Sequence, residues 1–267
     1  MKLKNKGSWL AIISGCALLA INLYGLTQNI RPANLQQTST RFANEKSISY
    51  QQALKQIKRQ TNETEQEFAN RISHVISQAI THIHWNEETD NQKYNQLIPI
   101  WENYFLYFMG KFSGIPEYQK YHFADYHRSL KRGIGICGDT SIIMSQIMAE
   151  NGIKSQILVY PLHVVLEANV NGTNRIFDAD YGIPLPYGSH NAAQKLTEIA
   201  AIYTQHGYTK HDEKLVHQIY SGQPIRFENV KHFITKKYYF EYISYCFKWI
   251  FPIMLLLIGL FRIKNSN

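Results

Sequence analysis

The chain has 267 residues, of which 45% are hydrophobic and 18% are charged. This length accommodates one soluble domain of ordinary size together with membrane segments. Lysine and arginine outnumber the acidic residues by enough to give a formal net charge of +8. The basic residues are scattered and form no recognised nucleic-acid-binding motif. We therefore expect no nucleic-acid partner, and we expect the charge to be either a general surface bias without a partner or an attraction to anionic lipid and acidic envelope polymer.

An apolar stretch near the N-terminus, residues 9–26, has about the length that an α-helix needs to cross a bilayer. Lysines precede it, so residues 1–8 are predicted to form a cytoplasmic tail. Residues 13–16 also resemble a bacterial lipoprotein signal, in which Cys16 would be lipidated after cleavage. However, mostly apolar sequence continues to residue 26, where a mature lipoprotein usually turns polar, and this favours an uncleaved membrane anchor.

A second apolar stretch, residues 242–261, contains Pro252 and leads into a short basic tail over residues 262–267. The aromatic residues at its N-terminal end are typical of a belt at a membrane interface. Lys248 lies near that end, where its ammonium could extend to the interface. Two spans would place both termini in the cytoplasm and the domain between them outside it. The sequence therefore predicts a two-span protein of the bacterial cell membrane with a periplasmic domain.

The segment between the two spans begins with a stretch rich in Asn, Gln, Thr and Ser, residues 27–46, which is predicted to be a polar linker. The domain is predicted over residues 47–237, and its first part has the periodicity of helices. These helical segments cover residues 47–60, residues 64–84 and residues 94–112, with Pro99 as a possible true start of the last one.

The second part of this domain combines helices with strands. A clear helix is predicted over residues 139–151, and Asn151-Gly152 ends it. Asn171-Gly172 is a strong signal for a two-residue hairpin turn between two strands. The predicted strands are residues 154–160, 163–170 and 175–178, and helices follow over residues 191–204 and 210–220. This order predicts an α+β fold in which helices pack on an antiparallel sheet, flanked by two transmembrane helices.

One of the three cysteines, Cys137, lies outside the apolar stretches. Cys16 and Cys246 are predicted to lie in the membrane, so the exported domain has a single thiol without a disulfide partner. Cys137 immediately precedes the predicted 139–151 helix, and a helix N-terminus favours the thiolate form of a cysteine. Neighbouring glycines would let a substrate backbone approach the thiol closely. These features favour a free and reactive cysteine, and the alternative is a small buried hydrophobic residue, which is what most free cysteines are.

A histidine and an aspartate on the following strands complete a plausible catalytic set. His163 begins one predicted strand and Asp178 ends the next, and Cys137 with these two residues has the layout of a Cys-His-Asp triad. Ideal pairing around the hairpin turn places His163 opposite Asp180 and one diagonal step from Asp178. Both aspartates then share the face of His163, so strand geometry leaves the choice between them open.

Three segments together resemble the transglutaminase-like superfamily of papain-related cysteine enzymes. They are Gly135-Ile-Cys137-Gly-Asp139-Thr140, His163-Val-Val-Leu-Glu-Ala-Asn-Val-Asn-Gly172 and Arg175-Ile-Phe-Asp178-Ala-Asp180-Tyr-Gly182. The resemblance covers about residues 131–182 and implies that Asp178 is the catalytic carboxylate, because in this family the aspartate follows an aromatic or apolar strand. Val165 and Ala179 stand where many members have an aromatic residue and a proline. We therefore expect the substrate pocket to differ from theirs.

The resemblance implies that Cys137 attacks an amide or similar acyl carbon, that His163 transfers the proton and that Asp178 orients His163. The resulting thioester would be resolved by water, as in a peptidase or amidase, or by an amine, as in a transglutaminase. We expect hydrolysis of a peptide, protein or envelope polymer, because water is abundant and the sequence indicates no amine pocket. No metal or organic cofactor is expected for this chemistry.

Two other interpretations of the domain stay open. A non-catalytic binding or assembly module, for envelope polymer or a membrane complex, would use the three residues structurally. A redox-sensing thiol at Cys137 would be oxidised reversibly and would not depend on His163.

Other histidines are weaker candidates for a functional role. His74, His82 and His84 lie on one predicted helix, but their spacing does not suit shared metal ligation. They are therefore predicted to be solvated or packed against the domain. His122 and His127 lie just upstream of Cys137 and are predicted to be surface residues.

Overall fold

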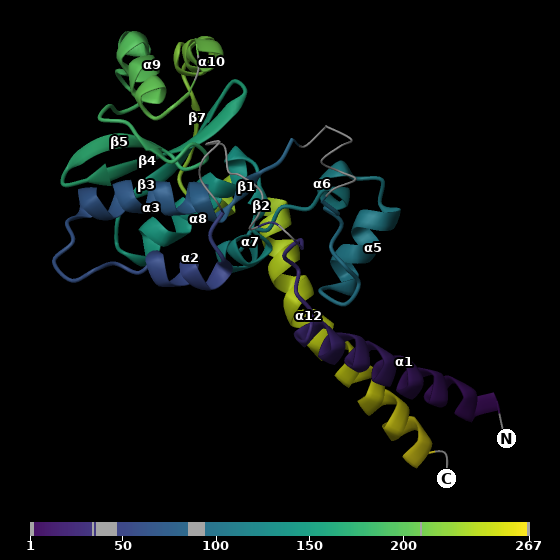
Figure 1. The fold of residues 1–267 in the computed structure, drawn as a ribbon. Helices are drawn as coiled ribbons and strands as arrows, with labels where there is room; N and C mark the ends of the chain where they lie inside the picture. The colour runs from purple at the N-terminus through teal and green to yellow at the C-terminus, as the bar shows by residue number, and fades with distance from the viewer. Residues whose placement is uncertain (1–2, 34, 36–46, 85–93, 209, 266–267) are drawn as a thin grey trace. The chain divides into compact units, whose positions relative to one another are not determined.

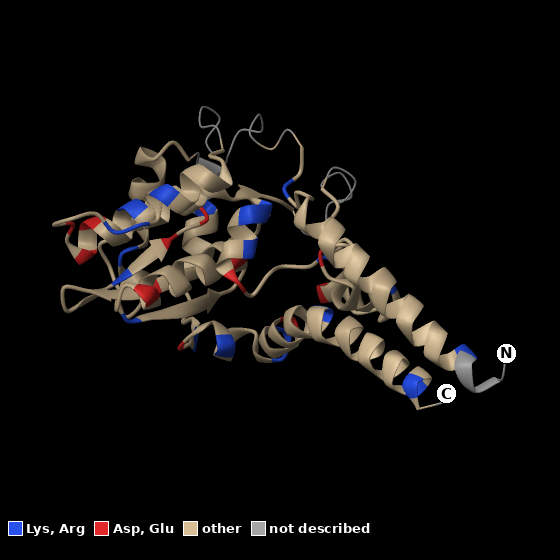
Figure 2. Ribbon diagram, turned by 90° about the horizontal axis from the view of Figure 1, so that it is seen from below, with Lys and Arg blue, Asp and Glu red and all other residues tan. Residues whose placement is uncertain are grey.

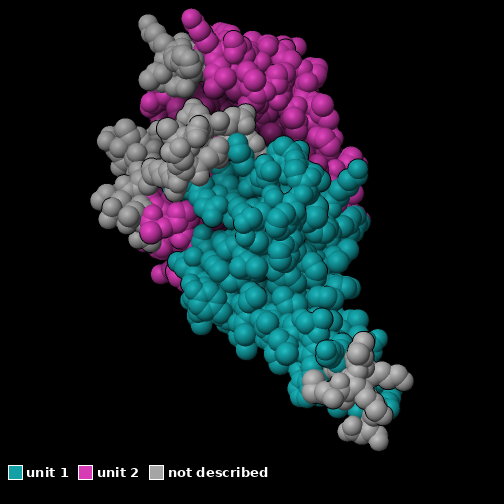
Figure 3. All heavy atoms as spheres, turned by 90° about the vertical axis from the view of Figure 1, so that its right-hand side faces the viewer, with its two compact units in different colours: residues 1–30, 91–121, 236–267 teal, residues 31–90, 122–235 magenta. Residues whose placement is uncertain are grey.

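The computed structural model describes residues 3–33, 35, 47–84, 94–208 and 210–265 (Figure 1). The chain divides into two compact units, which Figure 3 shows in different colours. Unit 1 consists of residues 1–30, 91–121 and 236–267, and unit 2 consists of residues 31–90 and 122–235. Residues 91–121 fall inside the sequence range predicted for the exported domain, but they cluster with the two long apolar helices.

Unit 1 contains two helices that are long and apolar enough to cross a membrane, α1 (Leu3–Leu26) and α12 (Thr235–Lys264). Only 11% and 17% of their most apolar windows are buried, so most of their side chains face outward and are not part of a soluble core. Charged residues are sparse in the apolar part of each helix, with none over residues 7–26 and only Lys248 over residues 242–261, and basic residues lie near the chain ends (Figure 2). The two apolar stretches of the sequence therefore form helices with the length and composition of membrane spans.

Small residues bring α1 and α12 into close contact. A Cβ atom at Gly15 would lie 2.8 Å from the Pro252 carbonyl oxygen, and one at Gly259 would lie 2.6 Å from the Ile12 side chain. Glycine at both positions therefore lets the two backbones approach, which is the packing that membrane helices commonly use.

Pro252 lies inside α12 without ending it. Proline has no N–H, so the carbonyl of Lys248, four residues earlier, lacks its usual intrahelical donor. Asn22 from α1 and the hydroxyl of Tyr104, at 2.9 Å, both donate to this carbonyl. The ammonium of Lys248 is buried rather than extended to a membrane interface, and it donates to the backbone carbonyl of Glu102 at 2.6 Å. Side chains thus replace the missing bond and allow the helix to continue.

Among its described residues, unit 1 also contains the helices α5 (Tyr104–Phe112) and α6 (Pro116–Gln119). The helix predicted over residues 94–112 begins only at Tyr104, so the expected start, whether at residue 94 or at Pro99, is wrong. The reason is an N-cap, because the Asn103 side chain accepts hydrogen bonds from the first backbone N–H groups of α5.

Unit 2 begins with residues that were predicted to form a linker. Arg31 donates to the carbonyls of Ile48 and Leu130, at 2.8 and 3.3 Å, and Leu35 is 1% exposed. These residues are therefore anchored in unit 2 and are not a free tether. Residues 34 and 36–46 of the predicted linker lie outside the described residues.

Two helices with capping boxes follow, α2 (Tyr50–Gln56) and α3 (Glu65–Ala79). The helix predicted over residues 64–84 ends at Ala79, and residues 81–82 form strand β1 (Thr81–His82) instead. Strand β1 pairs in parallel with β2 (Ile134–Gly135), just before Cys137. Pairing with a segment distant in the sequence therefore overrides the helical periodicity of residues 80–84.

A five-stranded antiparallel sheet forms the centre of unit 2, in the order β6-β5-β4-β3-β7. The strands are β3 (Ser155–Tyr160), β4 (His163–Val170), β5 (Thr173–Asp178), β6 (Ile183–Pro184) and β7 (Ile225–Phe227). The predicted hairpin is confirmed, because Val170 pairs with Thr173 and both turn residues, Asn171 and Gly172, have positive φ. The short strands β6 and β7 were not predicted.

Helices cover both faces of this sheet (Figure 1). One face packs against α3 and against α8 (Cys137–Glu150). The other face forms an apolar core with α9 (Leu196–Gln205) and α10 (Lys210–Tyr220). The other helical elements of unit 2 are α7 (Tyr126–Arg132), the 3₁₀ helix η2 (Ala192–Gln194) and α11 (Val230–Phe233). The fold is mixed α+β with an antiparallel sheet, as the order of elements predicted.

Candidate functional site

Cys137 is the first residue of α8, and it is partly buried. Ile136 before it is extended, and its N–H donates to the Asp139 carboxylate at 2.8 Å. The Thr140 hydroxyl donates to the Cys137 carbonyl at 2.9 Å. These two bonds fix the turn that carries the thiol. The first N–H groups of a helix have no intrahelical partner, so the helix presents donors and a positive dipole end at this thiol.

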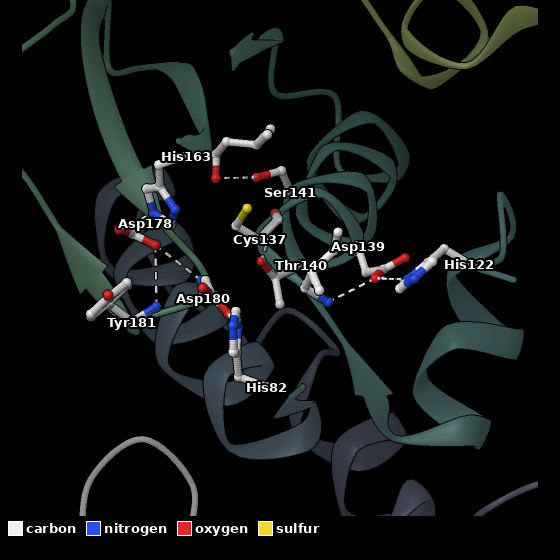
Figure 4. Close-up of polar contacts among 12 residues, drawn as sticks. His82, His122, Cys137, Asp139, Thr140, Ser141, His163, Asp178, Asp180 and Tyr181 are labelled. Carbon is white, nitrogen blue, oxygen red and sulfur yellow. Dashed lines mark hydrogen bonds and ion pairs between the residues drawn. The ribbon is translucent and has the colours of Figure 1, made fainter. Parts of the chain in front are cut away.

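His163 is the first residue of β4 and is 6% exposed. Its Nε2 lies 2.7 Å from the Asp178 Oδ2, and Figure 4 shows the Cys137 sulfur on the side of the His163 ring. Because Nε2 is engaged by the carboxylate, Nδ1 is the nitrogen that can exchange a proton with the thiol. The structure thus brings together the three residues that the sequence singled out.

Asp178 ends β5, and its side chain is fully buried. An isolated buried carboxylate would be strongly unfavourable, so its hydrogen bonds must compensate for lost hydration. It accepts four: from His163 Nε2 at 2.7 Å, the Tyr203 hydroxyl at 2.5 Å, and the backbone N–H groups of Asp180 and Tyr181, each at 3.1 Å. Two donors reach each oxygen, which fixes the plane of the carboxylate toward the imidazole.

The structure distinguishes the two aspartates that strand geometry had left open. Strands β4 and β5 pair in the predicted register, yet the carboxylate that bonds His163 is that of Asp178. Asp180 lies beyond the end of β5, and its Oδ1 lies 2.9 Å from His82 Nδ1 on β1 (Figure 4). Each aspartate therefore has its own histidine.

The protonation of His163 follows from its surroundings. Burial by itself lowers the pKa of His163, but the charge of Asp178, the hydrogen bond to it and the contact with Cys137 together outweigh burial. The pKa of His163 is therefore raised well above its usual value. A histidine with a raised pKa keeps its proton near neutral pH, and an imidazolium beside a thiol favours the thiolate.

A further buried pair stabilises the other side of the thiol turn. His122 Nδ1 bonds the carboxylate of Asp139, and the two side chains are 9% and 3% exposed. The prediction that His122 is a surface residue is therefore wrong, whereas His127 is exposed as predicted. The reason is that Asp139 faces inward to cap α8 and requires a buried partner.

The other histidines do not form a metal site. His82 lies on β1 rather than on the helix of His74, so the expectation that they share a helix is wrong. The rings of His82 and His84 meet edge to face with their centroids 5.6 Å apart. Across the part of the chain that the structure describes, no three His, Cys, Asp or Glu side chains are arranged to hold a metal ion.

Two tyrosines that the sequence did not single out complete the surroundings of Asp178. The Tyr203 hydroxyl donates to Asp178 and lies 3.0 Å from the Tyr220 hydroxyl. The Tyr181 ring meets the His163 ring edge to face, with centroids 5.5 Å apart. Tyr203 shares the buried face of α9 with apolar residues. That pattern indicates burial, but it cannot identify a hydroxyl partner 25 residues earlier in the chain.

Comparison of the chain with models of protein families, with curated proteins and with solved structures gives no match. The resemblance to the transglutaminase-like superfamily therefore rests on the three sequence segments alone.

Proposed function

We propose that this chain is a membrane-anchored thiol enzyme that acts on amide or peptide bonds, similar to transglutaminase-like enzymes. The observation that carries the proposal is the placement of the Cys137 sulfur beside the His163 ring, whose Nε2 lies 2.7 Å from Asp178 Oδ2. A partly buried thiol at a helix N-terminus, a protonated imidazole and an oriented carboxylate are the groups that acyl transfer through a cysteine requires.

The first half of the reaction forms a thioester. In the resting pair the Cys137 proton is already on His163 Nδ1, and the thiolate sulfur attacks the acyl carbon of the substrate. The oxyanion that develops is stabilised by backbone N–H groups at the start of α8, including that of Cys137. Collapse of this intermediate breaks the C–N bond, and the leaving amine takes the proton from Nδ1. Asp178 accepts the Nε2–H throughout and keeps the ring in the required orientation.

The second half releases the acyl group. Water gives a proton to His163 Nδ1 while its oxygen attacks the thioester carbon, and the C–S bond breaks to restore the Cys137 thiolate beside the protonated His163. An amine in place of water would give transfer instead of hydrolysis. We favour hydrolysis, because water is abundant outside the cytoplasm and the sequence indicates no amine pocket.

We further propose that α1 and α12 span a bacterial membrane and that unit 2 lies outside the cytoplasm. Their length, apolar composition and low burial support this placement. Basic residues close to the chain termini favour cytoplasmic ends. The substrate would then be a peptide, a protein or an envelope polymer.

The pH dependence of Cys137 alkylation tests the proposal. The full chain is purified in detergent with Cys16 and Cys246 replaced by alanine, so that iodoacetamide reports on one thiol. An ordinary thiol has a pKa of about 8.5, and we expect Cys137 to be labelled fast well below that pH. The rate should fall to that of an ordinary thiol in His163→Ala.

Two further variants make this experiment specific. Asp178→Asn should slow the labelling, because the carboxylate that keeps His163 protonated is lost, whereas His127→Ala should leave it unchanged, because His127 is exposed and lies outside the relay. Circular dichroism verifies that each variant is folded. An ordinary thiol profile that is the same in all four proteins would contradict the proposal and would favour a non-catalytic binding module.

A further inference from the structure

Exposed apolar side chains in this protein are concentrated in one segment outside the two long helices. Among the described residues outside α1 and α12, the large hydrophobic side chains that are exposed are Ile100, Phe108, Phe112, Ile115, Leu162 and Ile225. Four of these six lie within residues 100–115, on and around α5. Clusters of exposed apolar side chains generally mark a surface that a membrane or another protein covers.

The side chains of α5 (Tyr104–Phe112) divide between a packed face and an outward face. Leu106 and Gly110 are buried within unit 1. Phe108 and Phe112, one helical turn apart, are 48% and 70% exposed, and their rings stack with centroids 5.9 Å apart. Lys111 lies between them in the sequence and is exposed. This pattern is typical of a helix that lies in a membrane interface, with aromatic side chains toward the acyl chains and a basic residue at the headgroups.

Contacts within unit 1 attach α5 to one end of the apolar part of α12. The Asn103 amide donates to the Ser244 hydroxyl at 3.1 Å, and the Phe105 ring meets the Phe251 ring at 6.0 Å. These contacts hold α5 beside the N-terminal part of the stretch predicted to span the membrane. Phe251 is itself partly exposed, so α5 packs beside the exposed apolar surface of α12, which also includes Phe247 and Ile250.

We infer that α5 and the residues flanking it lie in the membrane interface, with Phe108 and Phe112 inserted among the lipid acyl chains. The occupant of this surface is the same bilayer that surrounds α12, because Phe105 of α5 packs against Phe251, an exposed residue of that helix. The inference rests on the proposed membrane placement of α1 and α12, and it does not depend on the chemistry of Cys137. It extends the membrane contact of the chain from two helices to a third element.

Site-directed spin labelling tests this inference on the full chain in vesicles of phosphatidylethanolamine and phosphatidylglycerol. The native cysteines are replaced by alanine, and one nitroxide is attached at a time. The labelled variants are Phe108→Cys, Phe112→Cys, Leu257→Cys and Leu162→Cys. Leu257 is 62% exposed on α12 and reports a lipid-facing position, whereas Leu162 is 75% exposed in unit 2 and reports an aqueous one. Power saturation then compares collisions with oxygen, which concentrates in lipid, and with a water-soluble nickel chelate.

We expect labels at 108 and 112 to collide more with oxygen than with nickel, as at 257, and the label at 162 to do the reverse. If 108 and 112 instead behave like 162 while 257 stays in lipid, the inference on α5 is wrong and the membrane placement stands. If 257 also collides mainly with nickel, the membrane placement itself is wrong. Spin–spin broadening at 112 that disappears on dilution with unlabelled protein would show that a second copy of the chain covers this surface, which also overturns the inference.

Discussion

Replacing Tyr203 by phenylalanine removes the hydroxyl that donates a hydrogen bond to Asp178, the carboxylate that orients His163. The ring of Tyr203 packs against Tyr181 and Tyr208, with centroids 5.4 and 5.9 Å away, and phenylalanine retains this packing. The substitution therefore isolates the hydrogen bond that Tyr203 donates to the fully buried carboxylate of Asp178.

The expected loss of stability follows from the two contacts of this hydroxyl. A hydrogen bond to a charged group contributes about 1.5–3 kcal/mol, and one between neutral groups contributes about 0.5–1.5 kcal/mol. The Tyr203 hydroxyl donates to the carboxylate of Asp178 and also lies 3.0 Å from the Tyr220 hydroxyl. We therefore expect Tyr203→Phe to lower the free energy of unfolding of unit 2 by about 2–4 kcal/mol. The alkylation rate of Cys137 should fall as well, since the carboxylate that orients His163 loses a donor.

Urea unfolding of the full chain in detergent measures this loss. Tyr208→Phe is the matched control, because its hydroxyl donates to a neutral backbone carbonyl of Tyr181 at 3.2 Å. That variant should lose only about 0.5–1.5 kcal/mol and should keep the alkylation rate of the parent protein. If Tyr203→Phe is no more destabilising than Tyr208→Phe, the argument that Asp178 is a charged acceptor of the Tyr203 hydroxyl is refuted.

Three other expectations concern separate parts of the chain. In a Cys137→Ala background the free energy of unfolding should fall as pH rises above about 6.5, by up to about 1.4 kcal/mol per pH unit. The reason is that the folded chain keeps a proton on His163 that the unfolded chain releases. If the same slope persists when His163 is also replaced by glutamine, His163 is not its origin. Asn22→Leu should lower the free energy of unfolding of unit 1 by about 1–3 kcal/mol, because the Lys248 carbonyl loses a donor. The loss should be much smaller in a Pro252→Ala background, where the backbone N–H of residue 252 can donate to that carbonyl. If the losses of the two substitutions simply add in a double-mutant cycle, Asn22 does not compensate for the proline. Gly133→Ala should lower the melting temperature, because φ there is +73° and the left-handed region disfavours a Cβ by about 1–2 kcal/mol; an unchanged melting temperature would argue against this turn.

Local signals in the sequence were sufficient to predict the elements that carry the site. The hairpin is set by Asn171-Gly172, because few residues other than glycine and asparagine adopt positive φ, and its two-residue length fixes the register of β4 and β5. Residues 139–151 were predicted as a helix from their apolar side and from the Asn-Gly stop. The structure begins this helix at Cys137, two residues earlier, so the thiol lies in the helix and not before it.

Features that depend on distant segments could not be predicted in the same way. The segment around His82 has the apolar spacing of a helix, but it pairs with residues more than 50 positions later and becomes a strand. Similarly, α5 begins where Asn103 caps it, a choice that competes with Pro99 and cannot be decided from composition. In each case a tertiary contact or a cap outweighs a modest local preference.

The choice of aspartate shows most clearly why the site required the structure. On the sequence, Asp178 and Asp180 are equivalent by strand face, and the family resemblance was the argument for Asp178. In the structure the two differ through groups that no local pattern connects to them: Tyr203, 25 residues later, donates to Asp178, while His82, 98 residues earlier, pairs with Asp180. A buried carboxylate needs several donors, and the segments that supply them determine which aspartate serves His163. Asp178 is thus the partner of His163 because each of the two carboxylates receives its own set of hydrogen-bond donors in the fold.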